Sequence, residues 1–148
     1  MRLLVCGLLT SLVLSADVTG VKSVYVLPMA GGLDQYLVNR LTGSQVFRVV
    51  TDPNLADAIF TEQLGEIFER KLTDLFPPPD AEEKDDNKPQ PHASAFGRGK
   101  GTIFLVDLKT RAVIWSGYER HTGSKPDVLD RTAGRIVQQI KKQQKLKE

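Results

Sequence analysis

The side chains that could carry acid–base chemistry are few and lie far apart in the chain. The 148 residues include two histidines and one cysteine. Asp34, Arg120 and His121 would suit a small hydrolase or transferase if folding gathered them, because general acid–base catalysis needs titratable groups within hydrogen-bond reach. Their separation in the sequence gives no reason to expect that arrangement. We therefore expect no catalytic residues, and a small enzyme of unknown reaction stays an alternative.

The sequence also predicts no bound metal and no cofactor. Neither His92 nor His121 has a second ligand at the spacing that metal sites use. The acidic run at residues 80–86 lacks the alternating oxygen ligands of a calcium-binding loop. A turn at residues 30–32 precedes an expected helix, where backbone N–H groups can hold an anion. The glycine motifs of phosphate-binding loops are nevertheless missing, so we interpret this turn as a tight connection.

The remaining candidates concern the binding of a partner. Two glycines occupy the expected strand-to-helix turn, and an acidic residue lies at the start of the helix that follows. An aromatic residue ends the last expected strand, and two basic residues come shortly after it. Two lysines near the end of the final helix could contact a protein or a polyanion. The net charge of only +2, with 41% apolar and 26% charged residues, is ordinary for a globular chain and does not indicate a specific nucleic-acid partner. The candidates are Gly31, Gly32, Asp34, Tyr118, Arg120, His121, Lys141 and Lys142.

The beginning of the chain has the order of a secretory signal peptide. Arg2 supplies a positive charge, residues 3–14 form a mostly apolar run, and small residues follow at Ser15 and Ala16. The run is shorter than the ~20 residues that span a bilayer. We expect residues 1–20 to act as a signal peptide, cleaved between Ala16 and Gly20. A retained anchor and an ordinary first strand are the alternatives.

Residues 21–148 are then expected to form a single α/β domain. Strands are predicted at residues 23–27, 46–51 and 58–61, and helices at residues 33–43 and 66–76. Gly43 is expected to close the first helix with a left-handed cap. Asp52 and Pro53 predict a very short helix that begins with an N-cap.

A linker is predicted at residues 77–100. This stretch holds five of the eight prolines and the acidic run, so it cannot bury enough apolar surface to offset the entropy of ordering. We expect a disordered excursion between two halves of one sheet, because the three short strands before it would make a poor fold alone.

The last third of the chain predicts a hairpin followed by an amphipathic helix. Two β-runs at residues 101–107 and 112–118 are joined by a short polar turn. Strict alternation would place Val113 and Trp115 on one face, with Trp115 in the core and Tyr118 nearer the edge. The helix begins near Pro126, with Ser124 expected to cap it, and its apolar stripe is Leu129, Ala133, Ile136, Val137 and Ile140.

The expected architecture is therefore a mixed sheet of about five strands with helices packed on it, in the order β-α-β-β-α-linker-β-β-α. The motifs at residues 56–61 (ADAIFT), 104–107 (FLVD) and 113–117 (VIWSG) carry a resemblance. The chain resembles the small exported α/β domains of bacterial envelope proteins, of the type found in curli-secretion lipoproteins and at the amino-terminal end of the translocation protein TolB. Related hairpin turns commonly carry glycine where Arg111 stands, and a left-handed arginine there would cost about 1–2 kcal/mol.

The resemblance implies a domain that assembles or binds in the envelope without catalysing a reaction. Together with the leader, it predicts an exported protein of the periplasm or cell envelope of a bacterium. Its expected partner is another envelope protein or a second copy of itself, with no transmembrane span once the leader is removed. A polyanion-binding protein that uses the basic C-terminal helix is the other alternative.

Overall fold

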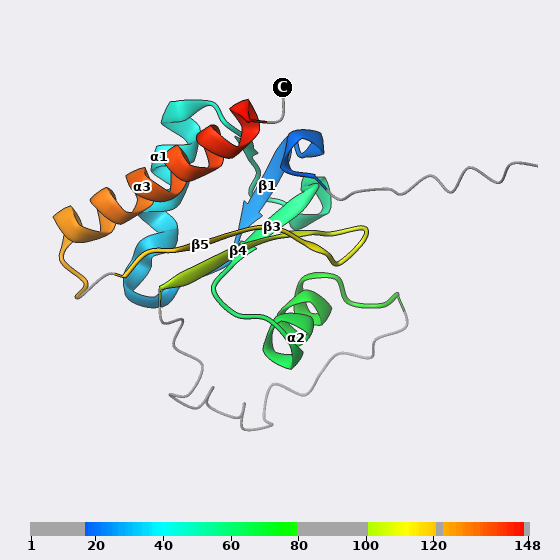
Figure 1. Ribbon diagram of the computed structural model, residues 1–148. Coiled ribbons are helices and arrows are strands. Elements are labelled where there is room, and N and C mark those ends of the chain that lie inside the picture. The colour runs from blue at the N-terminus through cyan, green and yellow to red at the C-terminus, as the bar shows by residue number, and fades with distance from the viewer. Residues whose placement is uncertain (1–16, 80–100, 121–122, 147–148) are drawn as a thin grey trace, which may run out of the picture.

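A computed structural model describes residues 17–79, 101–120 and 123–146, and the rest of the chain lies outside the described residues. The fold confirms the expected α/β class. Five strands form one mixed sheet in the order β2-β1-β3-β4-β5, and three α-helices pack on it. Figure 1 shows α1 and α3 together on one side of the sheet and α2 on the other. Most of the predicted leader, residues 80–100 of the predicted linker, and His121 fall outside the described residues.

The first half of the sheet is parallel. Strand β1 (Ser23–Val26) pairs in parallel with β2 (Arg48–Val49) on one side and with β3 (Ala58–Thr61) on the other. Helix α1 (Leu33–Ser44) connects β1 to β2, and its apolar residues at every fourth position, Leu33, Leu37 and Leu41, are all buried. Strand β2 covers two residues, whereas the sequence predicted six.

The end of α1 differs from the prediction. Gly43 lies within the helix, and Gln45 is the residue that adopts the left-handed conformation, with φ at 54°. Its backbone N–H bonds to the carbonyl of Thr42 at 3.4 Å. Glycine is favoured in that conformation but not required, and tertiary packing decides where the helix stops. After β2, Asp52 caps a short 3₁₀ turn, Pro53–Leu55, as predicted.

The second half of the sheet is antiparallel. Helix α2 (Glu66–Leu75) follows β3, and β4 (Thr102–Asp107) then pairs with β3 and with β5 (Val113–Tyr118). In the hairpin turn, the Asp107 carboxylate accepts hydrogen bonds from the backbone N–H groups of Lys109 and Thr110 at 2.9 and 2.7 Å. Arg111 has φ at 60°, so an arginine adopts the left-handed conformation in this turn.

An extra residue in β5 overturns the predicted alternation of its side chains. Leu105 pairs with Trp115, but Val106 pairs with Val113, so Ile114 is the additional residue of a β-bulge. Trp115 is buried, as predicted, and Ile114 is buried on the same side of the sheet. Val113 therefore does not share a face with Trp115, since the bulge shifts the pattern by one residue.

Helix α3 (Pro126–Lys145) closes the fold. The predicted stripe is buried in full, with Ile136 and Ile140 completely inaccessible. The N-cap is Lys125, which makes no side-chain cap bond, so the capping role predicted for Ser124 is wrong. None of the helices in the described part of the chain is long and apolar enough to cross a membrane.

Two apolar clusters lie on the two faces of the sheet. The larger one joins α1 and α3 to the sheet and includes Phe60 and Trp115, whose rings meet edge to face with centroids 6.4 Å apart. The smaller one joins Phe68 and Leu72 of α2 to Ile59 and Val106. A 3₁₀ turn, Val18–Gly20, precedes the expected domain start at Val21, and its Val18 is fully buried in the larger cluster.

Candidate binding surface

Carboxylates accept hydrogen bonds from the backbone at the turn of Gly31 and Gly32, which leads into α1, where Asp34 lies in the first turn. The two glycines have positive φ angles of 70° and 81° before α1 begins. Asp34 accepts a hydrogen bond from the backbone N–H of Met29 at 3.1 Å, and Glu62 accepts one from Ala30 at 3.0 Å. Two carboxylates thus already accept hydrogen bonds from the backbone of this connection, and their negative charge opposes the binding of a phosphate at the start of α1.

Tyr118 and Arg120 lie at the same end of the strands as this turn. Strand β5 is antiparallel to β4, which is antiparallel to β3, so β5 runs parallel to β1. The carboxyl end of β5 therefore lies at the same end of the sheet as the carboxyl end of β1. The connection to α3 packs there as well, because a side chain at Gly31 would meet the Ser124 hydroxyl at 3.1 Å. His121 lies outside the described residues.

This placement does not bring Asp34 and Arg120 into an arrangement that could catalyse a reaction. Both carboxylate oxygens of Asp34 are engaged within its own turn, Oδ1 by Met29 and Oδ2 by the Gln35 amide at 2.9 Å. Arg120 is exposed. In the part of the chain that the structure describes, no group of three or more His, Cys, Asp or Glu residues is placed to hold a metal ion.

Lys141 and Lys142 lie at the other end of the molecule, on the last turns of α3 (Figure 1). Both are exposed, but they belong to different sides of the helix. Lys142 is three residues after Gln139, whose side-chain amide donates to Glu119 at the end of β5 at 2.6 Å. Lys141 is eleven residues after Asp130, which forms an ion pair with Arg40 of α1. Residues three, seven or eleven apart share a helix face, so Lys142 faces the β5 side and Lys141 the α1 side.

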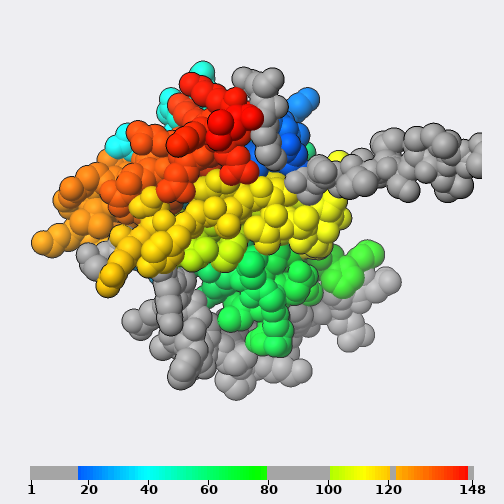
Figure 2. Space-filling view, viewed as in Figure 1, coloured from blue at the N-terminus to red at the C-terminus, as the bar shows by residue number. Residues whose placement is uncertain are grey.

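The strand β5 itself is the surface that sequence reasoning missed. Within the described residues it is the last strand of the sheet, with a neighbour on one side only. Its bulge places Val113, Ser116 and Tyr118 on the α2 side, where Val113 is 46% and Tyr118 60% exposed. In Figure 2 the hairpin, in yellow, forms a continuous band between α3 above and α2 below. The signal that could have found this surface is a final strand that carries no charged residue.

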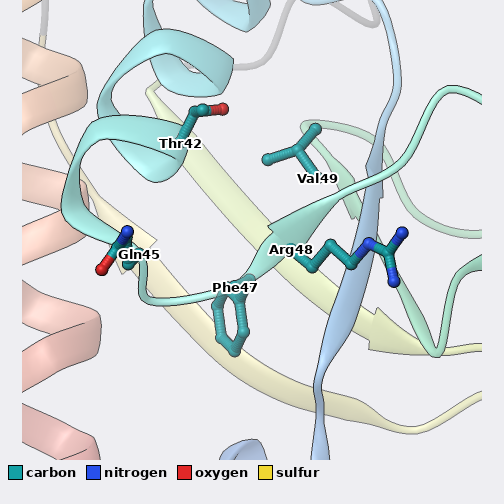
Figure 3. A pocket seen from close by; sticks show the side chains of 5 residues that line it. All are labelled: Thr42, Gln45, Phe47, Arg48 and Val49. Atoms are coloured by element: carbon teal, nitrogen blue, oxygen red, sulfur yellow. The ribbon is translucent and has the colours of Figure 1, made fainter.

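A pocket lies at the opposite edge of the sheet, beside β2. Thr42 and Gln45 at the end of α1 face Phe47, Arg48 and Val49 around a cavity of about 390 Å³ (Figure 3). Its lining offers a hydroxyl, an amide, a guanidinium and apolar surface. It contains no carboxylate, imidazole or thiol, so these side chains can bind a group but supply no general base.

The carboxylate of Asp57 has a structural set of bonds. It accepts from the backbone N–H groups of Ser23 and Lys22 at 2.9 and 3.0 Å and from the Ser23 hydroxyl at 2.9 Å. The Ser23 N–H is the largest cause that holds the pKa of Asp57 below its ordinary value. Burial opposes this lowering, while Lys22, the Ser23 hydroxyl and the charge of Lys109 reinforce it. All three bonds go to Oδ2, and Asp57 therefore ties the start of β1 to the start of β3.

Comparison with known proteins places this chain in no family: no family model, no curated protein and no solved structure matches it.

Proposed function

We propose that this chain is an exported, non-catalytic α/β domain that binds another protein of the bacterial cell envelope. The observation that carries the proposal is the β5 edge, which has one sheet neighbour among the described residues and exposes apolar surface at Val113 and Tyr118. Monomeric proteins usually guard such edges with charge, proline or a covering element. The envelope assignment is supported by the order of charge, apolar run and small residues at residues 1–16 and by the resemblance described above.

A site-specific crosslink tests the binding role. A photoreactive phenylalanine analogue in place of Tyr118 should capture a discrete protein from the envelope fraction. The same analogue at Asn39, which is exposed on α1 at the far side of the sheet, is the matched control and should not. Failure to capture any protein at Tyr118, or the same products at both positions, would overturn the proposal.

Export has its own test. We propose cleavage directly after Ala16, because Val18 is fully buried and a cut after Gly20 would remove it from the core. Amino-terminal sequencing of the native protein should therefore find Asp17 as the first residue. An intact Met1 on a cytosolic product would contradict both the export and the envelope assignment.

Polyanion binding is the rival that a specific feature favours. Lys141, Lys142 and Lys145 are exposed near the end of α3. Retention on heparin that persists in moderate salt and is lost when all three lysines become glutamate would favour this rival, since contacts with a polyanion depend steeply on salt. Retention unchanged by that triple variant would argue against it.

A further inference from the structure

We infer that the β5 edge binds an extended segment of the partner as an added strand, and that this segment alternates apolar and acidic side chains. The inference rests on the protein-binding function proposed above, and it deepens that function by naming the surface and the chemistry of the partner. Strand addition to a sheet edge takes its affinity from backbone hydrogen bonds and its specificity from alternate side chains.

The backbone of β5 offers a row of outward-facing groups. The N–H of Glu119 donates to the carbonyl of Gly101 at 2.7 Å, which makes that pair a hydrogen-bonded one. Hydrogen-bonded and non-bonded pairs alternate in an antiparallel ladder. Gly117 and Trp115 therefore point their peptide groups at β4, while Ser116 and Tyr118 point theirs away from the sheet. An added strand would find donors and acceptors at these two positions.

One side of this row is apolar. Val113, Ser116 and Tyr118 share the α2 face of the sheet, and the first and last of them are largely exposed. Successive side chains of an added strand would alternate between the two faces. Those on the α2 face would lie beside Val113 and Tyr118, so this face favours apolar residues at every second position of the partner.

The other side of the row is cationic. Arg135 donates through Nε to Glu119 at 2.7 Å, but the Glu119 side chain is only 14% exposed and the Arg135 side chain 49%. The Gln139 amide takes the other Glu119 oxygen, so the group presented to solvent is the guanidinium. Lys142 continues the same side of α3, two turns after Arg135. Side chains of an added strand that point toward α3 would meet these two cations, and carboxylates fit them.

The positive charge of Arg135 and Lys142 also favours another protein over a second copy of this chain as the partner. Pairing of β5 with its own twofold mate would place the two α3 helices side by side on one face. Arg135 and Lys142 of one copy would then face the same cations of the other, and like charges at short range oppose association. An acidic segment of another protein relieves that repulsion.

The test uses the full chain and a blocked heptapeptide that alternates valine and glutamate, Ac-VEVEVEV-NH2. Titration to millimolar peptide should shift the amide NMR signals of Ser116 and Tyr118 and slow their hydrogen exchange. The lysine counterpart, Ac-VKVKVKV-NH2, should bind at least about threefold more weakly, as expected for exposed charge pairs. Unchanged Ser116 and Tyr118 amides would overturn the inference, and so would equal binding of both peptides.

Two neighbouring lysines provide the matched variants. Lys142→Glu should weaken the glutamate peptide by about threefold to tenfold, whereas Lys141→Glu, on the α1 side, should leave its affinity unchanged. Equal effects of the two variants would show that only net charge matters, and this outcome would contradict strand addition at β5.

The outward-facing backbone groups of β5 are tested by one change in the protein and one change in the peptide. Ser116→Pro removes an outward N–H without breaking the bonds to β4, a position where edge strands accept proline, and it should abolish binding. Should that variant fail to fold, N-methylation of the peptide at alternate residues gives the same information: one of the two registers should lose binding and the other keep it. Equal tolerance of both N-methylated peptides would refute strand addition.

The outcomes also separate the inference from the proposed function. Capture of a protein through position 118 combined with no peptide effect at Ser116 leaves the binding function in place and rejects the strand-addition mode. A concentration-dependent dimer that Ser116→Pro abolishes would assign the edge to a second copy and would overturn the acidic partner.

Discussion

The parallel and antiparallel halves of the sheet end in two different edges. In the parallel half, β2 forms an edge of only two residues, one of which is the exposed Arg48, and its end folds against α1. In the antiparallel half, β5 forms an edge of six uncharged residues. Short, charged edges resist further strand pairing, whereas long uncharged ones invite it. The difference indicates that one edge terminates the sheet and the other is available to continue it.

The two halves are also stabilised differently. The parallel half depends on contacts between distant segments, such as the hydrogen bonds that the backbone N–H groups of Ser23 and Lys22 donate to Asp57 across more than thirty residues. The hairpin of β4 and β5 depends on local turn bonds to Asp107 and on the cover that α3 provides. Substitutions can therefore be chosen to affect both halves together or one at a time.

The largest effect is expected where both halves share a helix. Ile136→Asp places an unpaired carboxylate in the fully buried stripe of α3, and the cost of burying that charge should unfold the domain. Ile136→Ala is the matched variant, with an expected loss of about 2–5 kcal/mol. Thermal unfolding followed by circular dichroism measures both. A negligible change in each would mean that α3 does not pack on the sheet, and the comparison of the two edges would fail with it.

Gly101→Ala should destabilise the hairpin half. Gly101 has φ at 91°, and a Cβ there would lie 2.5 Å from the carbonyl oxygen of Glu119, which is backbone and cannot swing away. We expect a loss of about 1–3 kcal/mol from this strain. Gly43→Ala is the control, because Gly43 lies within α1 with open space around it and alanine is the better helix former. Equal unfolding midpoints for the wild type and Gly101→Ala would contradict the placement of β4 against the end of β5.

Asp57→Asn should weaken the parallel half in a pH-dependent way. The pKa of Asp57 is lowered in the fold, so its contribution to stability is present above the ordinary carboxyl pKa of about 4 and is lost as the pH falls below it. At neutral pH we expect the variant to lose about 1–3 kcal/mol, the usual cost of removing hydrogen bonds to a charged group. Melting temperatures of the two proteins, measured from pH 6 down to pH 2.5, should converge at the acid end. A constant gap across that range would contradict the role given to the carboxylate charge.

Arg111→Gly should produce the smallest effect and should stabilise the hairpin. Arg111 adopts φ at 60°, a conformation that costs L-residues about 1–2 kcal/mol and glycine almost nothing. Part of the gain is offset by the greater freedom of glycine in the unfolded chain, which leaves about 0.5–1 kcal/mol. Gln45→Gly in the parallel half likewise places glycine at a left-handed position, at the end of α1, and serves as a comparison. Chemical denaturation resolves both, and destabilisation by Arg111→Gly would show that the arginine side chain itself supports the turn.

The sequence predicted the elements that depend on local pattern. The stripe of α3, the strand at Ala58–Thr61 and the capped turn after Asp52 follow from spacing and cap chemistry, and the structure confirms them. Predictions failed where a distant contact decides. The ring of Trp115 packs against Gly117, where an added Cβ would lie only 2.4 Å from the ring. The bulge at Ile114 is in the same strand. A single extra residue in a strand leaves no mark in the local hydrophobic pattern.

The candidate surface was predicted only in part. Tyr118 was expected near an edge, and it lies there. Whether β5 has one neighbour or two depends on the sheet order, which joins strands from both ends of the chain and is not written in any local motif. Lys141 and Lys142 looked equivalent in the sequence, and only the contacts of α3 with Arg40 and Glu119 assign them to different sides of the helix.

The packing of Trp115 over Gly117 gives the protein a built-in spectroscopic probe. The chain contains one tryptophan, and its indole is buried on the hairpin, one residue away from the outward-facing Ser116. Its emission therefore reports on the packing of the hairpin against Phe60 of β3 and the rest of the larger cluster, without a label and without interference from other indoles. Loosening of the β4–β5 half would expose the ring to water and shift its fluorescence to longer wavelength, while an intact far-ultraviolet dichroism signal would show that the helices remain. The fluorescence of Trp115, read together with the dichroism signal, can thus distinguish local opening of the hairpin from unfolding of the whole domain.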